Sequence, residues 1–69
     1  MLEKNCYYQI QPLSLHMKDN ISKKEIILKQ DEVVKVLDFK GINVKIERLD
    51  TGEIFEVSKQ GLSFAVEKI

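Results

Sequence analysis

Two stretches of alternating apolar and polar residues flank the turn sequence Asp50-Thr51-Gly52, and they constrain the fold more than any other feature. Before the turn Val44 and Ile46 alternate with charged residues, and after it Phe55 and Val57 alternate with others. Successive side chains of a strand point to opposite faces, so this spacing predicts strands with one buried face. Glycine adopts the positive φ of a short hairpin loop without steric cost. The sequence therefore predicts an antiparallel hairpin whose four apolar residues lie in the core.

Shorter runs elsewhere show the same alternation. A strand is predicted over Cys6–Ile10, with Cys6, Tyr8 and Ile10 facing inward, and Pro12 ends it or places it at a sheet edge. Further strands are predicted over Leu13–Met17 and Leu62–Val66. About five short strands separated by turns favour an all-β fold, either a small barrel or a compact sandwich.

The segment 21–37 permits two interpretations. Ser22 and Glu25 have the spacing of a helix capping box, which favours an α+β fold with one helix at 22–37 packed on an antiparallel sheet. The apolar residues of the segment are mostly β-branched, however, and Gln30-Asp31-Glu32 is a polar break. We expect two strands here and keep the helix as the alternative.

The length of the chain, 69 residues, is enough for one domain, which we place at 1–69. A core of this size contributes only about 3–5 kcal/mol, and small domains often add disulfides, metals or oligomerisation. Cys6 is the only cysteine and His16 the only histidine, so we expect no internal disulfide, no metal site and no cofactor. Homo-oligomerisation stays open as a source of stability.

Charge and hydropathy narrow the classes of partner. Eleven basic residues balance eleven acidic ones, which argues against a DNA-mimicking inhibitor and gives no basic surplus for general nucleic-acid binding. The N-terminus has no apolar run typical of a secretory signal, and no run reaches the ~20 residues that span a bilayer. We therefore expect a cytoplasmic protein without a membrane partner.

From about Leu28 onward the chain resembles the SH3-like small barrels, including KOW- and Tudor-type modules. Residues 30–36 (QDEVVKV) resemble the start of one of their strands, residues 44–57 (VKIERLDTGEIFEV) their central hairpin, and Ser58–Ser63 the short helical turn before their final strand. The resemblance implies a five-stranded SH3-like barrel. It covers roughly the last forty residues and implies no activity, because many functions share this fold.

No residue pattern predicts catalysis. His16 has no partner beyond Asp19, which we interpret as a solvated turn residue, and it is expected to point outward. Cys6 alternates with apolar residues and is interpreted as a small core residue. The hairpin carboxylates interleave with Lys45 and Arg48 and are interpreted as a charge-paired surface: Glu47, Asp50, Glu53 and Glu56. We expect no enzymatic activity.

Binding is the more plausible function. Asp38-Phe39-Lys40-Gly41 predicts a type I turn with Gly41 in the left-handed region, so Phe39 is expected at a loop tip. Exposed aromatic residues often anchor partners. Phe39 and Lys40, with Tyr7 lining the same groove, are the predicted partner-binding residues; the alternative is that Phe39 folds back over one end of the barrel.

The sequence leads to three hypotheses, of which two concern the kind of binding partner and one a structural role. The leading hypothesis is a protein-binding module, an adaptor or inhibitor of a host protein from a phage or mobile element, a source suggested by ten lysines against one arginine. The alternative is a nucleic-acid-binding module that uses a basic patch of Lys18, Lys23, Lys24 and Lys29. A third hypothesis is a structural subunit of a phage particle that pairs through an edge strand around Pro12.

Overall fold

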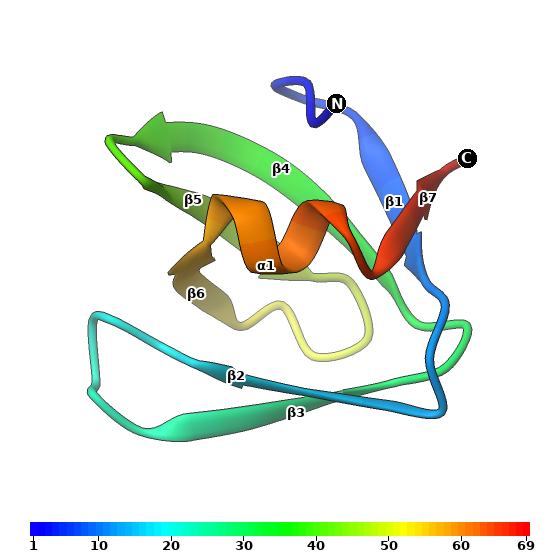
Figure 1. Cartoon of the computed structure of the whole chain (residues 1–69), viewed down its shortest axis with the longest axis horizontal. Helices are drawn as coiled ribbons and strands as arrows, with labels where there is room; N and C mark the ends of the chain where they lie inside the picture. The colour runs from blue at the N-terminus through cyan, green and yellow to red at the C-terminus, as the bar shows by residue number, and fades with distance from the viewer.

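The computed structural model describes all 69 residues and contains seven strands and one short helix (Figure 1). The elements follow one another in the order β1 (Tyr7–Ile10), β2 (Ser14–Lys18), β3 (Glu25–Lys29), β4 (Val33–Lys40), β5 (Asn43–Arg48), β6 (Ile54–Ser58), α1 (Lys59–Ser63) and β7 (Val66–Lys68). The predicted all-β class is confirmed. The strands form a five-stranded sheet and a two-stranded sheet, both antiparallel, and the large sheet is not closed into a barrel. No helix is long and apolar enough to span a membrane.

The large sheet has the strand order β6-β5-β4-β1-β7. Its β5–β6 hairpin confirms the predicted core, because Val44 pairs with Val57 and Ile46 with Phe55, and all four are buried. The Arg48 amide donates to the Glu53 carbonyl at 2.8 Å, so the loop spans residues 49–52, one residue longer than predicted, and Gly52 has a φ of +78°. β1 ends before Pro12, as expected, but it lies between β4 and β7. It is therefore not an edge strand that could pair with a neighbouring molecule.

The segment 21–37 forms two strands, which rules out the alternative helix. β3 and β4 are separated by the polar break at 30–32, where Asp31 takes a φ of +71°. β3 pairs with β2 so that Leu15 lies opposite Leu28 and Met17 opposite Ile26. Met17 and Leu28 belong to the same buried cluster as the inner face of the large sheet. The β2–β3 hairpin thus covers part of that face (Figure 1).

The chain after β6 differs from the predicted final strand. Residues 59–63 form α1, which agrees with the short helical turn implied by the resemblance to SH3-like barrels. The Ser58 hydroxyl caps this helix by accepting a hydrogen bond from the Gly61 amide at 3.1 Å. Leu62 is fully buried on the helix, whereas Phe64 ends it and is 82% exposed. Only Val66–Lys68 continue as a strand, because the helix breaks the period-two alternation.

The free edge of β6 is covered by a contact with Asp19, although the sheet is not closed into a barrel. It is the one buried charged residue, not the solvated turn residue expected from the sequence. Its Oδ1 accepts a hydrogen bond from the Glu56 amide of β6 at 3.0 Å, and the Asn20 amide donates to the Glu56 carbonyl at 2.7 Å. The tip of the β2–β3 hairpin therefore occupies the hydrogen-bonding edge of β6 that β7 would occupy in a closed barrel.

The carboxylate of Asp19 is held in its charged form. Burial by itself would raise its pKa, but hydrogen bonds from the Glu56 amide, the Ser22 hydroxyl and the Ile21 and Ser22 amides hold the pKa below 3.8. Both oxygens accept hydrogen bonds, and the bonds join two segments that are 37 residues apart. The carboxylate therefore stabilises the contact between the hairpin tip and the large sheet.

We expect Asp19→Asn to lower the free energy of unfolding by about 2 kcal/mol at pH 7, because the amide NH2 replaces an acceptor that faces buried donors. Since the folded-state pKa is depressed, this contribution is complete above the ordinary pKa of 3.8 and is lost as the pH falls through the folded-state value. Urea unfolding followed by circular dichroism at neutral and acidic pH measures both effects. Asp50→Asn, in the exposed hairpin turn, is the control. Equal stability of the two variants at pH 7 would contradict this role of Asp19.

Candidate functional site

A β-bulge in β4 determines which way Phe39 points. The pairing of β4 with β5 shifts between Val36 and Asp38, so that Val36 lies opposite Ile46 but Phe39 lies opposite Val44. Opposed residues in a sheet share a face, and a bulge exchanges the faces of the residues that follow it. Phe39 therefore lies on the same inner face as the buried Val44, at the far end of β4 from the centre of the core.

The predicted position of Phe39 at a loop tip is wrong. Asp38-Phe39-Lys40 belong to β4, and the turn is the two-residue connection Gly41-Ile42. The expected left-handed conformation of Gly41 is confirmed by its φ of +63°. Phe39 is 36% exposed, which agrees better with the alternative in which it folds over one end of the sheet.

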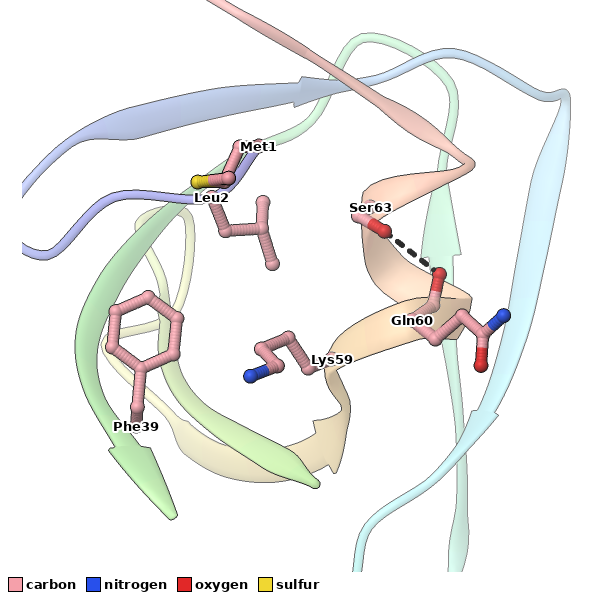
Figure 2. Close-up of a pocket in the computed structure, with 6 residues that line it drawn as sticks. All are labelled: Met1, Leu2, Phe39, Lys59, Gln60 and Ser63. Atoms are coloured by element: carbon pink, nitrogen blue, oxygen red, sulfur yellow. Dashed lines mark hydrogen bonds between the residues drawn. The ribbon is translucent and has the colours of Figure 1, made fainter. Parts of the chain in front are cut away.

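Phe39 lines a cavity of about 520 Å³ at this end of the molecule (Figure 2). One wall comes from β4 and from the N-terminal arm, which is the segment 1–6 before β1, and the other wall comes from α1. The lining residues are Met1, Leu2, Phe39, Lys59, Gln60 and Ser63, and we call this cavity the Phe39 pocket. Figure 2 shows Leu2 and Lys59 directed into the space between the walls, whereas the Gln60 side chain points away from it.

Both walls are held by hydrogen bonds. On the helix side, the Lys59 amide donates to the Ile42 carbonyl at 3.0 Å, and the Ser63 hydroxyl donates to the Gln60 carbonyl at 2.9 Å. Leu62 anchors α1 in the core. These contacts place Lys59 opposite the end of β4, so the pocket depends on the turn at 41–42 as well as on the helix.

The N-terminal arm is fixed at three points. The Glu3 amide donates to the Tyr8 hydroxyl at 2.7 Å, the Asn5 amide donates to the Val36 carbonyl at 2.7 Å, and Glu3 forms an ion pair with Lys68. The hydrogen bond and charge of Lys68 lower the pKa of Glu3. Leu2 is consequently buried at the floor of the pocket, where it is only 6% exposed.

Lys59 is the one charged side chain that lines the pocket. The Lys59 ammonium lies 5.5 Å from the centroid of the Phe39 ring, in a cation–π arrangement, and forms no ion pair. The nearby Asp38 is already engaged with Lys4 at 3.8 Å and Lys40 at 3.9 Å. The Phe39 amide and these lysines lower the pKa of Asp38. No acidic side chain lines the pocket, so its rim is positively charged.

The structure separates the other predicted partner-binding residues from Phe39. Tyr7 pairs with Lys35 on the outer face of the large sheet, where the Lys35 ammonium lies 5.6 Å from its ring centroid. Tyr7 and Phe39 therefore lie on opposite faces and do not share a groove. Lys40 follows Phe39 in β4 and interacts with Asp38 outside the pocket.

The predicted basic patch is also divided. Lys18, Lys23 and Lys24 lie at the tip of the β2–β3 hairpin, whereas Lys29 lies at the other end, opposite Ser14. The two ends are four strand positions apart, or about 13 Å. Three of the four lysines thus lie at the hairpin tip, and neither Tyr7 nor Phe39 is on that hairpin.

His16 and Cys6 were two of the residues considered for catalysis, and the structure shows which groups surround them. His16 lies on the outer face of β2, where its Nδ1 is 3.5 Å from the exposed Glu25. Cys6 packs against the core. No cluster of three or more histidine, cysteine or acidic side chains has the arrangement of a metal site.

One hairpin carboxylate lies opposite a predicted partner: Glu56 faces Lys45 across the β5–β6 hairpin. Glu47 instead lies opposite Lys35 of β4. Arg48 instead binds Glu32, which directly precedes β4, with two hydrogen bonds of 2.6 and 2.8 Å that lower the pKa of Glu32.

Sequence reasoning missed most of the pocket. Leu2, Lys59 and Ser63 were not among the predicted residues, because they are far from Phe39 along the chain. The one signal that could have found Lys59 is the helical turn expected at 58–63, which places a lysine at the start of a helix next to the β4–β5 hairpin.

Comparison of the chain with protein-family models, with curated proteins and with solved structures gives no significant match.

We expect Phe39→Ala to lower the free energy of unfolding by only about 1–2 kcal/mol, because the ring is partly exposed. Phe55→Ala is the matched comparison: it removes a ring that is 8% exposed and should cost about 3–5 kcal/mol, enough to unfold a domain of this size. Urea and thermal unfolding by circular dichroism distinguish the two variants. If Phe39→Ala unfolds the domain as Phe55→Ala does, Phe39 is a core residue and the pocket is only a packing defect.

Proposed function

We propose that this domain is a non-enzymatic protein-binding module and that the Phe39 pocket contacts the partner. The observation that carries the proposal is a concave, largely apolar cavity of about 520 Å³ with an aromatic ring and an unpaired lysine at its edge. Cavities of this size, lined by apolar groups with few polar ones, are typical of binding sites. Aromatic residues near the centre of an interface contribute much of its binding energy.

The hydrogen bonds and buried side chains beside the pocket also support the proposal. The Lys59 amide donates to the Ile42 carbonyl and the Asn5 amide to the Val36 carbonyl, and the side chains of Leu2 and Leu62 are buried. A preformed site loses little conformational entropy on binding, so a modest contact area can give useful affinity. The positions of Phe39 and Lys59 are therefore suited to recognition.

A more specific part of the proposal concerns the source of the protein and its role in the cell. We propose an adaptor or inhibitor from a phage or mobile element that acts on a host protein in the cytoplasm. This part rests on the small size, the neutral net charge and the strong preference for lysine over arginine.

Nucleic-acid binding is the second candidate, and it is supported by the three lysines at the β2–β3 hairpin tip. Binding of this kind would weaken steeply with salt, because it depends on release of counterions from the phosphates. A module of this type normally adds aromatic side chains that stack on bases, and the hairpin has none. We therefore favour the protein-binding proposal.

Site-specific photocrosslinking in the source cells tests the proposed function. Gln60 lies on the pocket rim with its side chain directed away from the cavity, so p-benzoylphenylalanine at this position leaves the cavity open (Figure 2). The same residue at Gln30, which is exposed in the turn before β4 and thus far from Phe39 along that strand, is the control. We expect a discrete crosslinked protein from position 60 that is absent from position 30 and is lost in the Phe39→Ala background. No crosslink at position 60, or the same products from both positions, would contradict the proposal.

A further inference from the structure

We infer that the Phe39 pocket binds a segment of a partner protein in which a large apolar side chain is flanked by carboxylate side chains. This inference rests on the proposed function and specifies the chemistry of the partner. Its two components are the apolar interior of the pocket and the unpaired charge of Lys59.

The apolar interior of the pocket is the reason for expecting a large apolar side chain in the partner segment. The Leu2 side chain forms the floor and the Phe39 ring forms one wall, and 36% of Phe39 remains exposed. An inserted aliphatic or aromatic side chain removes this apolar surface, and its own, from water, which is the main favourable contribution to binding at such a site. The cavity volume is sufficient for a large side chain.

Lys59 is the reason for expecting a carboxylate in the partner segment. Its ammonium group lies over the Phe39 ring and forms no ion pair, so water solvates it in the free protein. A partner that covers the pocket removes part of this water, and a charge that is covered without a counter-ion costs free energy. A carboxylate beside the inserted side chain replaces the lost hydration and adds a charge-assisted hydrogen bond.

The charged residues beside the pocket are paired, and Lys59 is not. Lys4 and Lys40 pair with Asp38, and Glu3 pairs with Lys68, so the uncompensated charge at this end of the molecule is that of Lys59. A basic segment would meet uncompensated positive charge here, and an uncharged segment would leave Lys59 without a partner. Charge complementarity therefore selects acidic flanking residues.

The proposal commits to a separate protein and not to a second copy of this chain. At the β5–β6 turn the chain itself exposes two apolar residues next to carboxylates, Leu49 beside Asp50 and Ile54 beside Glu53. Insertion of this turn into the pocket of another copy would be a head-to-tail contact, which produces rings or filaments. Self-association that Leu49→Ser abolishes would overturn the choice of partner.

The test uses the full-length, isotope-labelled protein and three acetylated and amidated octapeptides. All contain Leu-Phe at the centre, and they differ only in having glutamate, glutamine or lysine at the flanking positions. We expect the glutamate peptide to shift the amide resonances of Phe39, Lys59 and Ser63 and to bind about five- to tenfold more tightly than the glutamine peptide. The lysine peptide should bind more weakly than both.

Two variants separate the contribution of Lys59 from general electrostatic attraction. Lys59→Gln should reduce the affinity for the glutamate peptide to that for the glutamine peptide, whereas Lys24→Gln, at the hairpin tip, should leave it unchanged. Equal binding of all three peptides, shifts away from the pocket, or equal effects of the two variants would overturn the inference. Shifts at the pocket with a thymidine oligonucleotide but with no peptide would overturn it in favour of nucleic acid.

Failure of this inference is distinguishable from failure of the proposed function. If position 60 crosslinks a partner but acidic peptides are not preferred, the pocket binds protein and only its assigned chemistry is wrong. If neither a crosslink nor peptide binding is observed, both proposals fail.

Discussion

The structure depends on covering one apolar face of a sheet with very little chain. The inner face of β4, β5 and β6 presents Val34, Val36, Val44, Ile46, Phe55 and Val57, and a chain without a disulfide must bury all of them by packing alone. The β2–β3 hairpin covers one part of the face and α1 covers another. The hairpin stays in place because Asp19 and Asn20 bond to the backbone of β6. Exposed edges of a sheet invite unwanted pairing, so this contact also protects β6.

The Phe39 pocket lies where this cover ends. The hairpin tip reaches β6, and the N-terminal arm reaches Val36, but α1 is only five residues long and leaves a gap beside the end of β4. The β-bulge then turns Phe39 toward this gap instead of toward the outer face. The same incomplete coverage that leaves the sheet open therefore produces the cavity that we assign to a partner.

Much of the fold could be predicted because its signals are local. Alternation of residues marks β1 and β5–β6, β-branched residues mark β3 and β4, and Gly41 and Gly52 mark turns that need a positive φ. The errors occurred where a local signal was ambiguous or was overridden. The alternation of Leu62, Phe64 and Val66 predicted a strand where the chain forms a helix capped by Ser58. The turn predicted at 38–41 lies two residues later, because β4 continues through a bulge.

The sequence by itself determined the all-β class, the position of most strands and the residues of the central hairpin, because each of these follows from the preferences of neighbouring residues. Only the tertiary structure decided that Asp19 is buried, that Tyr7 and Phe39 lie on opposite faces, and that Lys59 meets the Phe39 ring. These features join residues that lie about twenty to forty positions apart, such as Asp19 with Glu56 and Phe39 with Lys59. Their chemistry arises from contact in space, and no local pattern of residues specifies such a contact.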